Sequence, residues 1–273
     1  MKKYIFLFTL SLLGSACSDD SKPVNIPETP KTEALVPSLN YTITQRFAHD
    51  TMAFTEGLVF HEGQLFESTG APEENPLTRS TFGIVDLKTG KIDVKAELDR
   101  NTYFGEGIAF FKDKVYQLTY KNKIGFIYDA KSFKNLGRFS YKNEEGWGMT
   151  TDGTHLIMSD GSNLLTYLDP ETLKEVKTLN VTNGGYAEDY LNELEFINGF
   201  IYSNVWMKNY IVKIDPATGK TVGILDLSAL TAEAKAKYDG SSELNGIAFE
   251  PLSGKFYVTG KMWPVIFEIE VGK

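Results

Sequence analysis

The chain has 273 residues, of which 42% are hydrophobic and 13% aromatic, and its formal net charge is −8. This length is sufficient for a large buried core, and the 24 glycines and many aromatic residues favour strands joined by turns. The acidic balance and the lack of a basic cluster in the sequence argue against a nucleic-acid partner. The single cysteine excludes an intramolecular disulfide, so packing must stabilise the folded chain.

The first 17 residues have the order of an export signal. Lys2 and Lys3 are followed by an apolar run (4–13), a small-residue stretch (14–16) and Cys17. This order resembles a bacterial lipoprotein signal, whose cysteine becomes the acylated first residue of the mature chain, although a glycine replaces the leucine usual three residues before it. The alternative is an ordinary secretory signal with an incidental cysteine. We expect an exported chain anchored by lipid at Cys17 to the bacterial cell envelope, on its periplasmic or outer surface.

Residues 18–39 are polar and carry four prolines, at positions 23, 27, 30 and 37. Such a composition favours an extended, flexible segment rather than a packed element. We therefore expect a tether over 18–39 and a folded domain over 40–273. No apolar run after the signal is long enough to span a bilayer.

The remainder of the chain repeats one unit five times. Each unit begins with an apolar strand that follows a glycine or a polar residue, and the units recur roughly every 40 to 50 residues. The segments are 54–60, 104–110, 146–150, 191–196 and 244–249. Each continues through a turn, a second strand, a third strand ending near an aspartate (Asp86, Asp129, Asp169 and Asp215 in the first four units) and a short outer strand.

Four antiparallel strands per unit and few helical patterns are typical of a β-propeller. We therefore predict an all-β fold, a five-bladed β-propeller. The fifth unit reaches residue 270 without a fourth strand, and the strand-like segment 41–47 can supply it, closing the ring with an N-terminal strand. A helix-like stretch, 230–238, is expected between the fourth and fifth blades.

In a propeller the first strand of each blade lines the central channel, so residues that open these strands meet although they lie far apart in the sequence. Glu56, Glu106, Trp147, Asn192 and Asn245 occupy this position in the five units. An Asn-Gly pair is also common turn chemistry, so we expect Asn245 to bond its own turn. The pattern predicts a polar and aromatic site at one face of the ring.

The same positions carry a family resemblance. Residues 41–270 resemble the plant and bacterial glutaminyl-peptide cyclotransferases (glutaminyl cyclases), which are five-bladed propellers. The shared motifs are Phe-Thr-Glu-Gly-Leu (54–58), Glu-Ser-Thr-Gly (67–70), Phe-Gly-Glu-Gly (104–107), Gly-Trp-Gly (146–148), Ser-Asp-Gly-Ser (159–162), Asn-Glu-Leu-Glu (192–195), Leu-Asn-Gly-Ile-Ala (244–248) and Thr-Gly-Lys (259–261), the last followed by Trp-Pro.

The resemblance implies an acyltransferase that converts an N-terminal glutamine of a peptide or protein to pyroglutamate and releases ammonia. It implies that Glu106 is the catalytic acid/base. The residues that it implies for substrate binding are Phe54, Glu56, Phe104, Tyr120, Trp147, Asn192, Trp206 and Lys261. Many relatives have glutamine in place of Glu56 and tryptophan in place of Tyr120, and these two differences bear on substrate preference and pH profile.

The chemistry agrees with these residue types. One carboxylate in a dry aromatic setting can take a proton from the attacking amine and return it to the departing one. A second carboxylate, Glu56, would raise the pKa of the first, and Asn192 or Lys261 could donate to the oxyanion. The scheme requires no cofactor and no catalytic metal, although a structural cation in the channel remains open. We expect a monomer.

Two other functions fit the ring of polar residues. In a calcium-dependent lactonase-like propeller, Glu56, Glu106, Asn192 and Asn245 would be oxygen ligands of a channel cation, although the indole of Trp147 would then displace a ligand. In a non-catalytic cell-surface propeller, the same ring would be a recognition pocket. The three histidines show no ligand spacing, and no Gly-x-Ser-x-Gly motif occurs in the sequence.

Overall fold

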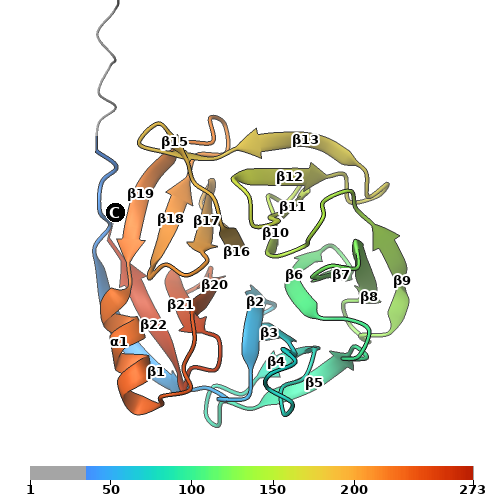
Figure 1. Ribbon diagram of the computed structural model, residues 1–273, viewed down its shortest axis with the longest axis horizontal. Helices are drawn as coiled ribbons and strands as arrows, with labels where there is room; N and C mark the ends of the chain where they lie inside the picture. The colour runs from blue at the N-terminus through green and yellow to red at the C-terminus, as the bar shows by residue number, and fades with distance from the viewer. Residues whose placement is uncertain (1–34, 273) are drawn as a thin grey trace, which may run out of the picture. The chain divides into compact units, whose positions relative to one another are not determined.

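The computed structural model describes residues 35–272, which form five four-stranded antiparallel sheets arranged as blades around a central axis (Figure 1). The predicted five-bladed propeller is confirmed. The predicted signal, 1–17, and the tether up to residue 34 lie outside the described residues. No helix within 35–272 is long and apolar enough to cross a membrane.

Each blade is a meander whose first strand lies nearest the axis. Blade one contains β2 (Phe54–His61), β3 (Gln64–Gly70), β4 (Thr81–Val85) and β5 (Ile92–Glu97). Blade two contains β6 (Gly105–Phe111), β7 (Lys114–Thr119), β8 (Ile124–Asp129) and β9 (Asn135–Ser140). Blade three contains β10 (Met149–Thr151), β11 (Leu156–Met158), β12 (Leu164–Leu168) and β13 (Glu175–Asn180). Blade four contains β16 (Leu191–Ile197), β17 (Phe200–Val205), β18 (Tyr210–Ile214) and β19 (Thr221–Asp226).

The fifth blade is assembled from both ends of the described chain. Its inner strands are β20 (Leu244–Glu250), β21 (Lys255–Gly260) and β22 (Val265–Val271), and its outer strand is β1 (Tyr41–Ala48). β1 pairs antiparallel with β22 along its length, from Tyr41 opposite Val271 to Ala48 opposite Val265. The N-terminal strand therefore covers an edge that the fifth sheet would otherwise expose.

Residues 37–39, which the sequence assigned to the tether, bond to the propeller. Leu39 N–H donates to the carbonyl of Ile224, and Ile224 N–H donates to the carbonyl of Pro37. Ser38 thus forms a parallel bridge to β19 in blade four. The last residues of the predicted tether therefore pair with the outer strand of blade four. The outer strand of a blade has unpaired backbone groups, so a short segment can add to it.

Two insertions interrupt the repeat. The predicted helix is present as α1 (Ser228–Lys237), between blades four and five, and Glu233 in it accepts two hydrogen bonds from Arg46 of β1, at 2.8 and 3.0 Å. A small hairpin, β14 (Thr182–Asn183) and β15 (Tyr186–Ala187), precedes blade four and was not expected from the sequence.

The aspartates at the ends of the third strands explain the turns that follow them. Each accepts a hydrogen bond from a backbone N–H two residues later, which is the local bond that makes Asp a strong turn former. The acceptors are Asp86, Asp129, Asp169 and Asp215.

Five buried apolar clusters lie between neighbouring blades. Between blades one and two, for example, Phe66 and Phe82 pack with Ile108, Phe110 and Tyr128. The other clusters join the remaining pairs of blades in the same way, including the junction between blades five and one. Because each cluster takes residues from two sheets, burial of apolar area stabilises the ring as well as the individual blades.

Two glutamates of β16 tie the innermost strands together across the channel. The Glu193 carboxylate accepts the backbone N–H of Leu58 in blade one at 3.2 Å and of Ile247 in blade five at 2.8 Å. The Glu195 carboxylate accepts the N–H of Phe249 at 3.3 Å and the hydroxyl of Thr150 at 3.4 Å. Both side chains are structural bridges between blades.

The pH dependence of stability tests the Glu195 bridge. Burial raises the pKa of Glu195 to about 8 from an ordinary value of 4.5, although three hydrogen bonds oppose the shift. The folded state therefore keeps a proton that the unfolded state loses, and this contribution to stability falls as the pH rises from 4.5 to 8. We expect Glu195→Gln to remove a slope of about 1.4 kcal/mol per pH unit. Urea unfolding from pH 5 to pH 8 measures it, and parallel curves for wild type and variant would contradict it.

Candidate active site

β-bulges deliver the polar residues that open the innermost strands. The pairing of β2 with β3 shifts between Thr55 and Gly57, leaving Glu56 out of register. Equivalent shifts lie at Glu106, at Asn192 and at Asn245 in their own blades. A bulge turns one residue out of the ladder and re-aims its side chain. This explains why carboxylates and amides, which are poor strand residues, stand at the start of buried strands.

The glycines beside these residues permit the close approach of neighbouring blades. A Cβ on Gly107 would lie 2.5 Å from the backbone nitrogen of Met149, and one on Gly148 would lie 2.1 Å from the carbonyl oxygen of Asn192. Gly107 N–H also donates to the carbonyl of Trp147 at 2.8 Å. The Gly-Glu-Gly and Gly-Trp-Gly motifs therefore follow from backbone contact around the axis.

A pocket of about 520 Å³ opens at this end of the ring, and we call it the axial pocket. All nine site residues predicted from the sequence line it: Phe54, Glu56, Phe104, Glu106, Tyr120, Trp147, Asn192, Trp206 and Lys261. Six further residues complete its wall: Glu74, Glu145, Asp160, Gly161, Tyr190 and Glu243. The blades thus bring together side chains that are up to about 200 residues apart.

A buried ion pair forms one side of the pocket. Lys261 Nζ lies 2.8 Å from Glu56 Oε1, and the two side chains are 7% and 3% exposed. Asn245 Nδ2 donates to Glu56 Oε2 at 3.1 Å and to the carbonyl of Thr55 at 2.9 Å, so the expectation that Asn245 bonds its own turn is wrong. The Lys261 ammonium also lies 4.7 Å from the ring centroid of Phe54.

Burial and the partner's charge act in opposite directions on the pKa of each member of this pair. Burial raises the pKa of Glu56 to about 7, even though the Lys261 ammonium opposes the shift. Burial alone would lower the pKa of Lys261, but Glu56 and Glu106 outweigh it and the net shift is upward. Lys261 is therefore a buried, charged donor in the pocket wall.

Glu106 has no such partner. Its side chain makes no hydrogen bond or ion pair to another residue within 35–272, although the residue is only 5% exposed. Burial raises the pKa of the Glu106 carboxyl well above its ordinary value of 4.5; Glu56 and Glu145 raise it further, and Lys261 opposes them. The backbone is fixed independently, since the carbonyl of Glu106 accepts the hydroxyl of Ser68 at 2.5 Å. Glu106 thus has a bonded backbone and a carboxyl that is free to exchange a proton with a ligand.

Aromatic rings form two opposing parts of the wall. Phe54, Phe104 and Tyr120 follow one another with centroid distances of 6.0 and 5.8 Å. Trp147 and Trp206 are 5.9 Å apart at 81°, and Trp147 Nε1 donates to Glu145 at 2.9 Å. These rings supply apolar surface to the pocket wall and offer π faces to a cationic ligand.

The lactonase-like alternative receives no support from the arrangement of its expected ligands. Glu56 and Asn245 bond each other, and the Lys261 ammonium stands where a cation would have to approach Glu56. Within residues 35–272, no group of three or more His, Cys, Asp or Glu side chains could hold a metal ion. Asn192, 3% exposed, has an amide oxygen without a hydrogen-bond partner among these residues.

Three of the six further wall residues share a signal in the sequence. Glu145, Tyr190 and Glu243 each lie one or two residues before a position already identified at the axis, so the entry to each strand could have been included. Tyr190 is held at a positive φ of 68° by backbone hydrogen bonds to Gly161 and Trp206, which turn its ring toward the rim. Asp160 accepts the backbone N–H and the hydroxyl of Ser162 and also lines the pocket.

Comparisons with known proteins agree with this geometry. The sequence matches the glutamine cyclotransferase family over residues 15–271. It is 37% identical over 231 residues to a glutaminyl-peptide cyclotransferase of Arabidopsis thaliana, covering 84% of this chain and 70% of that protein. The fold matches the crystal structure of Myxococcus xanthus glutaminyl cyclase with a TM-score of 0.79 and 35% identity, over 87% of this chain and 98% of that one. The chain belongs to the glutamine cyclotransferase family, as its motifs predicted.

Replacing Lys261 by methionine tests the buried ion pair. Without the ammonium, the pKa of Glu56 should rise above its present value of about 7. Well above pH 7 the wild-type carboxylate is charged, whereas the variant still holds a proton that its unfolded state lacks, so the variant keeps losing stability with rising pH where the wild type no longer does. We expect Lys261→Met to cost about 3–5 kcal/mol at pH 9 and less at pH 7, measured by urea unfolding. An equal cost at both pH values would contradict the pairing.

Proposed function

We propose that this protein catalyses the cyclisation of N-terminal glutamine in peptides or proteins to pyroglutamate, with release of ammonia. The observation that carries the proposal is the unpaired Glu106 carboxyl, buried in an aromatic pocket beside a fixed Glu56–Lys261 ion pair. Membership of the glutamine cyclotransferase family supports it. All the groups that the reaction uses belong to one pocket of one chain, so a monomer suffices.

In the proposed mechanism Glu106 moves one proton twice. Its carboxylate takes a proton from the α-amino group while that nitrogen forms a bond to the δ-carbon of the glutamine side chain. The protonated Glu106 then donates to the carboxamide nitrogen, the carbon–nitrogen bond breaks, and ammonia leaves. A carboxyl with a pKa well above its ordinary value performs both transfers efficiently near neutral pH. The carboxylate is regenerated with the product.

The other pocket residues orient the substrate. Lys261 or the amide of Asn192, which both line the pocket, would donate to the oxyanion of the tetrahedral intermediate. Phe54, Phe104 and Trp147 keep the site dry and fold the side chain over the amine, which gives much of the rate in an intramolecular ring closure.

Glu106→Gln is the direct test of this function. The amide is similar in size but cannot take up the amine proton, so we expect kcat/KM for a Gln-initiated dipeptide to fall at least about 100-fold. A coupled ammonia assay, with mass spectrometry of the cyclised product, measures it. Glu195→Gln is the matched control, because Glu195 is an equally buried glutamate outside the axial pocket.

Three results would overturn the assignment. Wild type without activity on any Gln-initiated peptide would reject the function. Full activity in Glu106→Gln would reject the role of this residue. Lactone hydrolysis that a chelator abolishes would favour the calcium-dependent alternative.

The charge of the axial pocket predicts a preference at the residue that follows glutamine. Six carboxyl side chains line the pocket against one lysine: Glu56, Glu74, Glu106, Glu145, Asp160 and Glu243. We expect kcat/KM for Gln-Lys peptides to exceed that for Gln-Glu peptides by about tenfold, with neutral Gln-Gln in between, and the ratio to shrink as salt is added. Equal rates at low ionic strength would contradict this preference.

We further propose that the enzyme acts at the bacterial cell envelope, anchored by lipid at Cys17. The order of Lys2, Lys3, the apolar run and the cysteine supports export and acylation. Cells that express the full chain with a radiolabelled fatty acid should label wild type and should not label Cys17→Ser, which should leave the membrane fraction. An unlabelled wild-type chain would instead indicate an ordinary secretory signal.

A further inference from the structure

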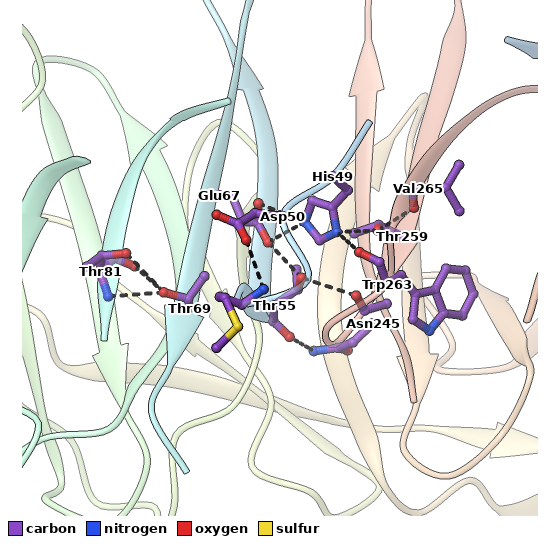
Figure 2. A network of polar contacts seen from close by, with 12 residues as sticks. His49, Asp50, Thr55, Glu67, Thr69, Thr81, Asn245, Thr259, Trp263 and Val265 are labelled. Carbon is purple, nitrogen blue, oxygen red and sulfur yellow. Dashed lines mark hydrogen bonds and ion pairs between the residues drawn. The ribbon is translucent and has the colours of Figure 1, made fainter. Parts of the chain in front are cut away.

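Behind the axial pocket lies a second buried ion pair that contributes nothing to the pocket wall. His49 follows β1 and Glu67 lies in β3, and both side chains are fully buried (Figure 2). His49 Nε2 lies 3.0 Å from Glu67 Oε1 and 3.1 Å from Oε2. The sequence gives no sign of this pair, because His49 and Glu67 belong to no spacing pattern and meet only in the folded chain.

Geometry fixes the protonation state of His49. Its Nε2 faces the Glu67 carboxylate, and its Nδ1 lies 2.7 Å from the carbonyl oxygen of Trp263. A carboxylate and a carbonyl oxygen only accept, so beside an ionised Glu67 both ring nitrogens donate and the ring is an imidazolium. Burial lowers the pKa of His49, but Glu67, the Trp263 carbonyl and Asp50 outweigh it and the net shift is upward. The pair is therefore charged, and each member compensates the other.

Glu67 connects this pair to the strand that carries Glu56. Thr55, the residue immediately before Glu56, donates its hydroxyl to Glu67 Oε1 at 2.7 Å. The carbonyl of Thr55 in turn accepts the Asn245 amide that also bonds Glu56. Glu56 stands at a bulge, where the hydrogen bonds between strands do not fix the direction of its side chain. The bond from the Thr55 hydroxyl to Glu67 holds the backbone next to Glu56 in place.

His49 connects the same pair to the loop that carries Lys261. Besides the bond from Nδ1 to Trp263, the backbone N–H of His49 donates to the carbonyl of Pro264 at 3.2 Å. The N–H of Met262 donates to the carbonyl of Ala53, two residues before Thr55, at 2.8 Å. Met262 has a positive φ of 60°, a conformation that needs outside support. One buried pair thus holds both backbone segments from which the Glu56–Lys261 ion pair projects.

We propose that His49 and Glu67 are positioning residues for the Glu56–Lys261 ion pair of the axial pocket, acting through Thr55 on one side and the 260–264 loop on the other. The inference rests on the proposed cyclase function for its kinetic consequence only. The geometric consequence holds whether or not the protein cyclises glutamine, because it concerns the alignment of Lys261 with Glu56.

Thr55→Val is the smallest change that interrupts the connection, and Thr150→Val is its matched control. Both threonines are buried on innermost strands, and both hydroxyls contact a buried glutamate of another strand, Glu67 in one case and Glu195 in the other. Only Thr55 leads to the ion pair. Urea unfolding measures how much each substitution destabilises the protein. If the two losses are similar, a difference in kinetics between the variants does not come from lost stability.

We expect Thr55→Val to lower kcat/KM for a Gln-initiated dipeptide by at least about tenfold and to shift its pH profile, while Thr150→Val does neither. The second readout needs no activity: the pKa of Glu56, followed by ¹³C NMR of labelled glutamate, should rise in Thr55→Val as Lys261 moves away and stay constant in Thr150→Val. An unchanged Glu56 pKa in Thr55→Val would overturn the inference. Inactivity of wild type would reject the proposed function alone.

A pair of variants at Glu67 separates hydrogen bonding from bulk. In Glu67→Gln every contact can be remade, because the amide oxygen accepts from Thr55 and the amide N–H donates to a neutral His49 whose Nδ1–H still reaches Trp263. In Glu67→Leu none can. We expect kcat/KM and the Glu56 titration to stay close to wild type in Glu67→Gln and to change in Glu67→Leu as in Thr55→Val. Equal effects of the two substitutions would contradict positioning by these hydrogen bonds.

Discussion

Backbone contact around the axis is the constraint on which the site depends. A side chain on Gly107 or Gly148 would collide with the next blade at 2.5 or 2.1 Å, so the innermost strands can meet only where glycine stands. Each of these two glycine contacts involves a strand whose pairing shifts register at that point. The residue left unpaired by the shift points its side chain toward the axis. Glu56, Glu106 and Asn192 reach one pocket for this reason. The glycines and the functional residues beside them are two results of the same packing.

The two carboxylates nearest the chemistry differ because their surroundings differ. Glu56 is held by Lys261 and Asn245, and it keeps a fixed direction in a buried setting. Glu106 lacks such partners among residues 35–272, so burial and the neighbouring negative charge act on it with little compensation. In the proposed function these two acidic groups take different roles, Glu56 orienting the substrate and Glu106 transferring a proton. The His49–Glu67 pair supports the orienting role of Glu56, because it holds the backbone segments from which Glu56 and Lys261 project.

Much of this arrangement follows from the sequence, and the part that does not has a physical reason. The repeat predicted the blades, and the aligned positions of Glu56, Glu106 and Asn192 predicted a common site. Both predictions were possible because equivalent packing positions in successive blades recur at regular intervals in the sequence. Three features of the structure have no repeating pattern in the sequence that could predict them. The partner of Asn245, the burial of Lys261 and the link from His49 to Glu67 depend on which chains meet in space. Rim residues such as Tyr190 project from irregular turns that do not repeat between blades.

The account depends on Glu106 being a buried carboxyl that holds its proton above the ordinary range. Titration of the Glu106 side chain in the free enzyme, by ¹³C NMR of labelled glutamate and with assignment by loss of the signal in Glu106→Gln, measures this directly. The account predicts a pKa well above 4.5, matching the ionisation seen in kcat/KM. A Glu106 that titrates near 4.5 would contradict it.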